Sequence, residues 1–232
     1  MSVVNAGTSV FALKYKDGIM FAADTSITYG SMMKHKKAQR ISPVGEESLF
    51  ACSGEMADFQ NLKKMLAEKY EEDLCENDGA CFLHPKDYFN WVARMQYQKR
   101  LKSDPIMVTA LFGGIHNKTK EPFLGSTNFH GTKVEADYLL TGLAMHYCTP
   151  LFTNRWSADM SEADARKLIE DCMRLLFFRD KKGHDEIQIG KITYTGGVVV
   201  EDSYKIEASS DLQFFYNRTN EFWRPMRKEI YD

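Results

Sequence analysis

The sequence predicts an α+β domain in which antiparallel sheets and helices form layers, and three observations lead to this fold class. Strand-like segments come in groups, and helical segments are inserted between the groups. The strict strand–helix alternation of a doubly wound parallel sheet is missing, which favours antiparallel sheets with helical layers. Hydrophobic residues make up 44% and charged residues 27% of the 232 residues, which is the balance of a folded globular chain.

The N-terminal block predicts a β-hairpin. Residues 8–16 alternate between two faces, and the Asp-Gly pair at 17–18 is a strong turn signal. Residues 19–23 are all apolar, as expected of a strand that is buried on both faces. The hairpin would return Asp24 to the level of Thr8.

The middle of the chain predicts two helices between strands. Residues 48–53 have the pattern of a strand that ends at Gly54. Apolar residues then recur at helical spacing over 56–72. Pro85 begins a second helix, because proline is tolerated in the first turn. Further strands are expected at 106–115, near 122–127 and at 133–139.

The last third predicts one or two helices and a closing pair of strands. Residues 143–151 are a candidate short helix. Ser161 is a helix N-cap followed by acidic residues, and an apolar stripe continues to Leu176. Strands are expected at 186–193 and 197–206. With no repeat or linker, we expect a single domain over 8–210, a short segment 1–7 before it and an extension 211–232 after it.

The net charge indicates which classes of partner to expect, and the cysteine content indicates the cellular compartment. Thirty basic and 32 acidic residues give a net charge of −2, which offers no electrostatic reason to expect nucleic acid or anionic membrane. No signal peptide is visible, and no apolar run approaches the roughly 18 residues of a membrane span. Five cysteines, an odd number, indicate reduced thiols in the cytoplasm or nucleus.

No cofactor or metal site is predicted. Cys75, Cys81 and His84 lie close in sequence, but their spacing is not that of a zinc site and no fourth ligand is near. A glycine-rich phosphate loop is also missing. The basic run Lys34-His35-Lys36-Lys37 is expected to be a solvated loop or a site that faces an acidic neighbouring subunit.

The extension 211–232 has a composition that suggests function. Its four acidic and four basic residues cancel, and six aromatic residues are too many for a free tail in water. The extension either folds back over its own core or docks into neighbouring subunits. The candidate interface residues are Phe214, Phe215, Tyr216, Phe222, Trp223 and Arg224.

Several motifs, taken in order, resemble those of 20S proteasome β subunits. They are Gly7-Thr8, the turn at 17–18, "AAD" at 22–24, "TYGS" at 28–31, "SGEMADFQ" at 53–60, "YQKRLKSDP" at 97–105, "LLTGLAMHY" at 139–147 and "CMRLLFFRD" at 172–180. The resemblance covers roughly residues 7 to 205 and is greatest to subunits at the beta-7 position of the ring, which another naming scheme calls beta type-4.

The resemblance implies a fold and a set of partners. Family members are four-layer αββα sandwiches of the N-terminal nucleophile hydrolase fold, with two antiparallel sheets between helical layers. They assemble with other α and β subunits into stacked seven-membered rings that carry out ATP- and ubiquitin-dependent protein degradation in the cytoplasm and nucleus. In beta-7-like subunits the C-terminal extension reaches the opposite β ring.

The resemblance also implies a catalytic site, part of which is retained. In active family members a threonine exposed by cleavage after glycine is the nucleophile, and its free amine helps to accept the proton. Thr8 falls on that threonine. Asp24 and Asp180 fall on the two aspartates of the site.

Three other positions of that site have changed type. Arg40 replaces a lysine, and a guanidinium stays protonated and cannot relay a proton. Leu143 and Gly183 replace two serines. We therefore expect Thr8 to be catalytically silent and the chain to be a structural subunit. The alternatives are an active threonine endopeptidase that uses Thr8, and a free-standing binding protein on the same fold.

Overall fold

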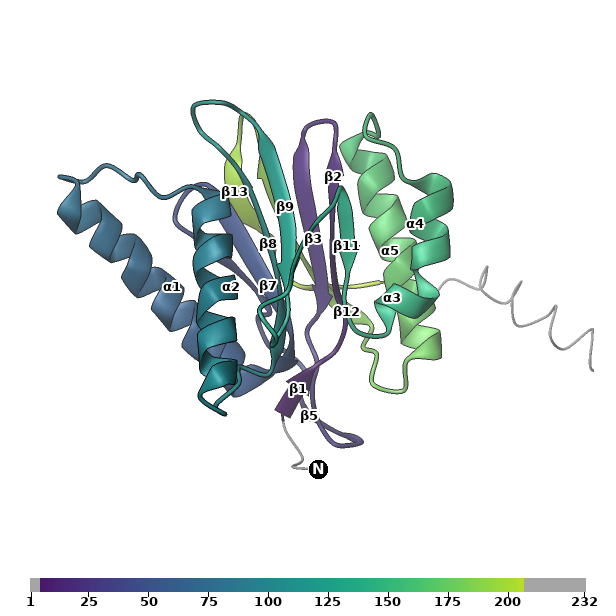
Figure 1. Ribbon diagram of the computed structural model, residues 1–232. Coiled ribbons are helices and arrows are strands. Elements are labelled where there is room, and N and C mark those ends of the chain that lie inside the picture. The colour runs from purple at the N-terminus through teal and green to yellow at the C-terminus, as the bar shows by residue number, and fades with distance from the viewer. Residues whose placement is uncertain (1–4, 207–232) are drawn as a thin grey trace, which may run out of the picture.

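Two antiparallel sheets stack face to face, and helices cover the outer face of each sheet (Figure 1). The computed structural model describes residues 5–206. From one side to the other, the layers are a helical pair, the larger sheet, the smaller sheet and a second helical group. The predicted α+β fold and the αββα layering are thereby confirmed.

The larger sheet has the strand order β10-β9-β8-β7-β1-β4-β5, and β6 also pairs with β7. Its strands are β1 (Asn5–Gly7), β4 (Ile27–Tyr29), β5 (Met32–His35), β6 (Ile41–Val44), β7 (Ser48–Glu55), β8 (Val108–Ile115), β9 (Pro122–Thr127) and β10 (Lys133–Glu135). All of its pairings are antiparallel.

The smaller sheet has the order β11-β2-β3-β12-β13, and β14 also pairs with β12. Its strands are β2 (Val10–Tyr15), β3 (Gly18–Asp24), β11 (Tyr138–Leu140), β12 (Glu186–Thr193), β13 (Gly197–Val200) and β14 (Tyr204–Lys205). The central strand β3 is buried along its whole length, because helices cover one of its faces and the larger sheet covers the other.

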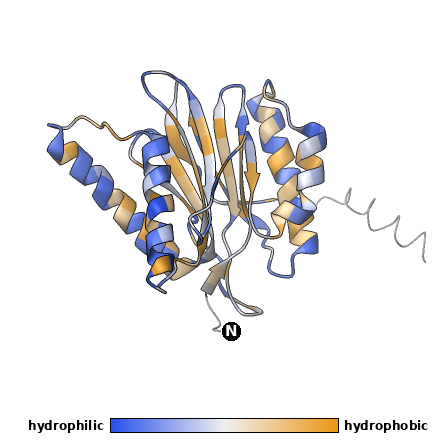
Figure 2. Ribbon diagram, in the orientation of Figure 1, coloured by the Kyte–Doolittle hydropathy of each residue, from blue (hydrophilic) through white to orange (hydrophobic). Residues whose placement is uncertain are grey.

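The helices form the two outer layers. α1 (Met56–Glu76) and α2 (Pro85–Leu101) pack on the larger sheet, whereas α3 (Ala144–Tyr147), α4 (Thr149–Arg155) and α5 (Glu162–Arg179) pack on the smaller one. Hydropathy follows this layering, with apolar strands in the interior and polar outer helix faces (Figure 2). Among residues 5–206, no helix combines the length and the apolar character needed to cross a membrane.

Three apolar clusters hold the four layers together. Phe50 and Phe112 of the larger sheet pack against α1 and α2. A second cluster fills the space between the sheets, where Phe21 of β3 lies among residues from both. The third cluster joins the smaller sheet to α3, α4 and α5, and it includes the edge-to-face pair Phe11 and Phe152.

The predicted N-terminal hairpin is confirmed. β2 and β3 pair with Val10 opposite Ala23 and Tyr15 opposite Gly18. Gly18 has φ +156°, close to fully extended, and an added Cβ would collide with the carbonyl oxygen of Ile192 at 1.9 Å. The hairpin therefore places Asp24 at the level of Thr8, as the turn signal indicated.

Other segments differ from the prediction. The strand expected at 133–139 is two strands, β10 in the larger sheet and β11 in the smaller one, because the chain crosses between the sheets at Ala136 and Asp137. The strand expected at 197–206 is interrupted between β13 and β14. The helix expected at 143–151 is the pair α3 and α4, and the helix expected at 56–72 continues to Glu76.

Two predictions fall wholly or partly outside the described residues. The candidate interface residues Phe214, Phe215, Tyr216, Phe222, Trp223 and Arg224 lie beyond residue 206. The boundary between the domain and the extension, at 210–211, lies there as well. Both remain predictions.

Candidate functional site

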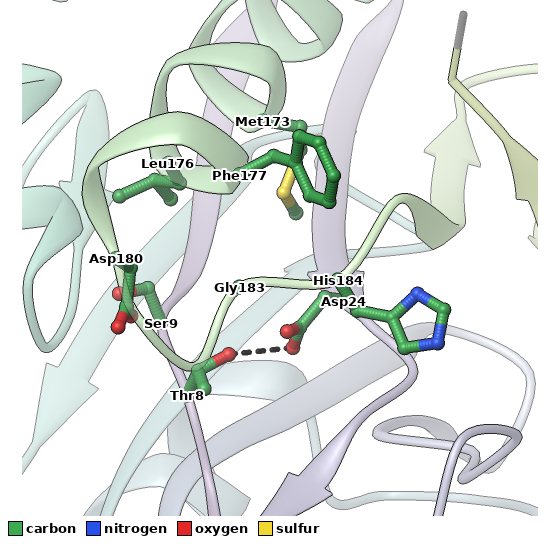
Figure 3. Close-up of a pocket in the computed structure, with 9 residues that line it drawn as sticks. All are labelled: Thr8, Ser9, Asp24, Met173, Leu176, Phe177, Asp180, Gly183 and His184. Carbon is green, nitrogen blue, oxygen red and sulfur yellow. Dashed lines mark hydrogen bonds between the residues drawn. The ribbon is translucent and has the colours of Figure 1, made fainter. Parts of the chain in front are cut away.

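Thr8 lies between β1 and β2, at the end of the molecule where the two sheets meet α5. Its hydroxyl donates a hydrogen bond to Oδ1 of Asp24 at 2.6 Å. Asp24 closes β3 and is 4% exposed, so the pair sits at the buried end of the N-terminal hairpin (Figure 3). The sequence prediction that these two residues meet is therefore correct.

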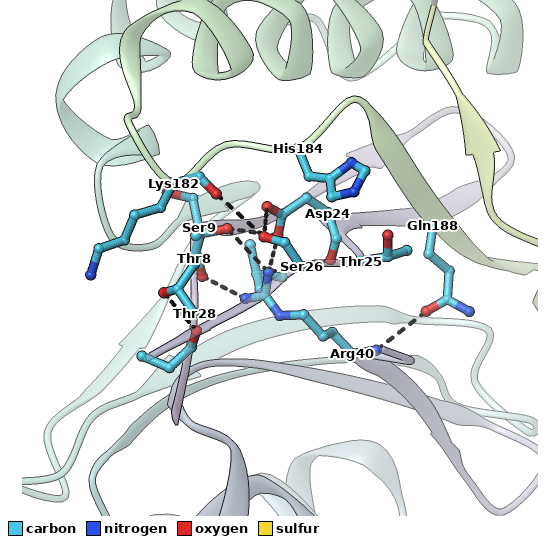
Figure 4. A network of polar contacts seen from close by, with 12 residues as sticks. Thr8, Ser9, Asp24, Thr25, Ser26, Thr28, Arg40, Lys182, His184 and Gln188 are labelled. Carbon is cyan, nitrogen blue, oxygen red and sulfur yellow. Dashed lines mark hydrogen bonds and ion pairs between the residues drawn. The ribbon is translucent and has the colours of Figure 1, made fainter. Parts of the chain in front are cut away.

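Arg40 occupies the centre of the site and is 1% exposed. It immediately precedes β6, and its guanidinium extends between the two sheets toward Thr8 and Asp24 (Figure 4). Nη1 donates to the Asp24 carboxylate and lies 3.3 Å from the Thr8 hydroxyl oxygen. Nη2 donates to the carbonyl oxygens of Thr8 and Cys52, the latter at 3.1 Å.

The Asp24 carboxylate accepts hydrogen bonds from three side chains. Oδ1 accepts from both Thr8 and Arg40, and Oδ2 accepts from the Ser26 hydroxyl at 2.8 Å. Hydrogen bonds to an ionised group are stronger than those between neutral groups. Asp24 therefore fixes the orientation of the Thr8 hydroxyl.

Burial and charge act in opposite directions on Arg40. Burial lowers the pKa of the guanidinium, and the adjacent Asp24 carboxylate raises it. A guanidinium remains protonated in proteins even so. Burial raises the pKa of the nearby Cys52 thiol, which is therefore neutral and leaves Asp24 as the counterion. The centre of the site is therefore a buried ion pair between Arg40 and Asp24.

The residues ahead of Thr8 are part of the sheet. Gly7 pairs with Ile27 of β4 on one side and with Gly54 of β7 on the other. A Cβ at Gly7 would lie 2.6 Å from Nε of Arg40, so the guanidinium is packed directly against this glycine. As long as the peptide bond between Gly7 and Thr8 is intact, the Thr8 nitrogen is an amide and not a basic amine.

Leu143 is brought to the site by a turn that binds β2. The Thr141 hydroxyl accepts from the backbone N–H of Val10 at 2.9 Å, and Ser9 Oγ accepts from the N–H of Ala144 at 3.0 Å. This turn sets Leu143, which is 41% exposed, on the wall of an open depression that Thr8 also lines. An apolar side chain thus lines this depression at the position where the resemblance implies a serine in active family members.

Asp180 and Gly183 belong to the turn after α5. Asp180 is buried, and its Oδ1 accepts from the N–H of Lys182 at 2.9 Å. An added Cβ at Gly183 would lie 3.0 Å from the Leu176 carbonyl oxygen, so the turn packs tightly on the helix end. Asp180 therefore fixes its own turn, and the described contacts include no bond from it to Thr8.

The space around Thr8 is divided. The enclosed cavity between Thr8, Asp24 and α5 has a volume of about 10 Å³, room for roughly one water molecule. The open depression outside it has a volume of about 620 Å³ and is rimmed by Arg179, Lys181 and Lys182. A peptide could reach the outer depression but not the Asp24 carboxylate.

All six positions named from the resemblance thus surround one point in the structure. Thr8, Asp24 and Arg40 are in direct contact, whereas Leu143, Asp180 and Gly183 line the adjoining spaces. Sequence reasoning missed Ser26, the Cys52 carbonyl and the packing of Gly7 against Arg40. Ser26 could have been suggested by its position two residues after Asp24.

Cys75, Cys81 and His84 do not form a common site. Cys75 is exposed, and the Cys81 thiol donates to the Leu83 carbonyl at 3.3 Å. Within residues 5–206, no group of three or more His, Cys, Asp or Glu side chains is arranged to hold a metal ion.

Comparison with known proteins identifies the family. A family model described as proteasome subunit matches residues 4–192. "Proteasome subunit beta type-4" of Arabidopsis thaliana is 37% identical over 92% of this chain and 85% of its own length. The Drosophila melanogaster protein of the same name is 31% identical over 86% of this chain and 74% of its own length.

A fungal protein has the same identity to this chain as the Drosophila melanogaster protein. "Probable proteasome subunit beta type-7" of Schizosaccharomyces pombe is 31% identical over 82% of this chain and 74% of its own length. Both names, type-4 and type-7, belong to the ring position that the motifs of this chain resemble most.

Replacing Arg40 with methionine is expected to lower the free energy of unfolding by about 3–5 kcal/mol, because Asp24 is left buried without its counterion. Urea denaturation of the purified chain measures this change. Arg155→Met is the matched control, since the exposed pair of Arg155 and Asp171 contributes about 0–1 kcal/mol. Equal losses in the two variants would contradict the role assigned to the buried pair.

Gly7→Ala is expected to destabilise the chain through collision with the guanidinium of Arg40. Lysine ends at Nζ and lacks the two terminal guanidinium nitrogens, one of which the new methyl group would meet at 2.9 Å. Its unforked, flexible chain can also move away from the methyl group, so Arg40→Lys should relieve part of the loss. A double-mutant cycle is expected to give a coupling of about 0.5–3 kcal/mol, the range for residues in contact. Strictly additive effects would mean that Gly7 is required for another reason.

Proposed function

Because this chain belongs to the proteasome subunit family, we propose that it is a non-catalytic β subunit of the 20S core particle. The observation that carries the proposal is the buried Arg40, which occupies the centre of the site and binds Asp24 and Thr8. General base catalysis needs a group that can give up and regain a proton near neutral pH. Arg40 does not meet that need, and Asp24 is already occupied.

The proposed work of the chain is architectural. It would occupy one place in a seven-membered β ring, in contact with other α and β subunits, and help to enclose the chamber in which active partners hydrolyse peptides. The names of the relatives, beta type-4 and beta type-7, support the corresponding ring position. Function would then lie in packing surfaces rather than in a catalytic site.

The proposal includes a location and a process. We propose that the chain acts in the cytoplasm and nucleus, within ATP- and ubiquitin-dependent protein degradation. The five cysteines support a reducing compartment, because all are free thiols and three of them are buried. A buried thiol needs no partner to be stable in such a compartment.

The extension 211–232 is proposed to join the two halves of the particle by docking on the opposite β ring. The support comes from its sequence, in which six aromatic residues accompany an equal number of acidic and basic residues. Aromatic and arginine side chains such as Trp223 and Arg224 are frequent anchors at protein interfaces.

The peptide bond between Gly7 and Thr8 is expected to remain intact in the assembled particle. Intact-mass measurement should show that this subunit still carries the residues before Thr8. A threonine-directed covalent inhibitor should leave Thr8 unlabelled. The active β subunits of the same preparation, which should be labelled, are the control. A chain that begins at Thr8 and carries an adduct on Oγ1 would establish the alternative, an active threonine endopeptidase.

Deletion of residues 212–232 is expected to leave the thermal unfolding of the isolated chain unchanged but to impair the joining of two half-particles. Native gels or native mass measurement would then detect half-particles. The variant Lys228→Ala/Glu229→Ala keeps every aromatic residue and should assemble normally. Full assembly of the truncated chain would contradict the docking role, and a stable lone monomer in cells would contradict ring membership.

A further inference from the structure

The hairpin of β4 and β5 presents an unusual surface. Residues 29–37 are exposed without interruption, and they include Tyr29, Met32 and Met33 at 43%, 65% and 38% exposure. The hairpin projects from the same end of the molecule as β1 (Figure 1). Large apolar side chains at the tip of a projecting hairpin indicate a surface that is covered in the working protein.

The apolar tip has a defined shape. Tyr29 and Met32 are directly opposite in the β4–β5 register, so their side chains lie together on one face. At the base of the hairpin, the Thr25 hydroxyl donates to the Lys36 carbonyl at 2.6 Å and the N–H of Ala38 donates to the Thr25 carbonyl at 2.9 Å. A hairpin fixed in this way loses little conformational entropy when it binds.

The charged side chains of the hairpin itself have one sign. His35, Lys36 and Lys37 follow the apolar residues, and the sequence has no Asp or Glu between Asp24 and Glu46. A second basic segment, Arg179 to Lys182, adjoins the base, where the Lys182 carbonyl lies 3.3 Å from the Ser26 hydroxyl. The one acidic residue in that segment, Asp180, is buried and bonded to its own turn.

We propose that the β4–β5 hairpin is an interaction surface for an acidic region of a neighbouring subunit, an apolar pocket with Asp or Glu side chains at its rim. The inference rests on the proposed function for the existence of such a neighbour. The aromatic and methionine side chains would fill the pocket, and Lys36 and Lys37 would pair with its rim. Electrostatic attraction of this kind speeds association and selects the correct partner.

A protein partner fits the surface better than a nucleic acid does. Nucleic acid binding by a hairpin needs several phosphate contacts over a broad positive surface, whereas the whole chain carries a net charge of −2. The tip itself is apolar and not positively charged, because Tyr29 and Met32 precede the lysines. A hairpin with an apolar tip and positively charged residues near its base is complementary to an apolar pocket with an acidic rim.

Charge reversal tests the proposal. Lys36→Glu/Lys37→Glu should slow incorporation of the chain into particles roughly tenfold, with the effect reduced at high salt. The matched control is Lys118→Glu/Lys120→Glu, in the exposed β8–β9 turn. β1 pairs with β7 at Gly54, and β4 pairs with β1 on its other side. The β8–β9 turn adjoins the other end of β7, where Ser48 lies opposite Gly114 of β8, so the control lies at the opposite end of β7 from the hairpin.

Photo-crosslinking identifies the partner directly. A benzophenone amino acid introduced at Met32 in the assembled particle should crosslink to one neighbouring subunit, at a peptide that contains or adjoins Asp or Glu. Crosslinks only to nucleic acid, only to this chain or only to a peptide without acidic neighbours would overturn the proposal. Equal loss of incorporation in the two charge-reversal variants would overturn it as well.

The incorporation experiment distinguishes failure of the hairpin proposal from failure of the proposed function. If the unmodified chain is never found in particles, the proposed function fails, and the hairpin inference fails with it. If the unmodified chain is incorporated and Lys36→Glu/Lys37→Glu is incorporated at the same rate, only the hairpin inference fails. Circular dichroism and thermal unfolding of each variant check that the fold is retained.

Discussion

The structure around Thr8 depends on one buried guanidinium. Arg40 must find acceptors for its donors once it is enclosed between the sheets, and an unpaired charge there would cost several kcal/mol. The acceptors come from three strands or their immediate neighbours: the Asp24 carboxylate of β3, the Cys52 carbonyl of β7 and the Thr8 carbonyl after β1. The ion pair therefore fixes how the larger and smaller sheets meet at this end of the molecule.

Under the proposed non-catalytic role, the same guanidinium is the reason that Thr8 would be silent. It pairs with the carboxylate that accepts a hydrogen bond from the Thr8 hydroxyl, and it is packed against Gly7, where a side chain would collide with it. The hydroxyl of Thr8 is oriented by Asp24. Leu143 lines the adjoining open depression, and the Gly183 turn packs tightly on the end of α5.

Much of the fold and of the site around Thr8 could be predicted from the sequence. The features that could not be predicted were hidden for physical reasons. The β2–β3 hairpin follows from a local turn signal, and the three contacts of Thr8, Asp24 and Arg40 follow from the resemblance. β1, β4 and β5 are three or four residues long, too short for a period to emerge, and β6 contains Pro43, which weakens any strand pattern. The carbonyl acceptors of Arg40 belong to the main chain, which is the same at every residue, so no residue type in the sequence indicates them.

The position of β1 has a consequence for proteolytic processing of this chain. In the described strand order, β1 alone connects the β4–β5 hairpin to β7 by backbone pairing. Residues 5–7 are therefore a strand of the larger sheet, and cleavage before Thr8 with release of that strand would separate the hairpin from β7. A cut at this bond would thus open the larger sheet as well as free an amine.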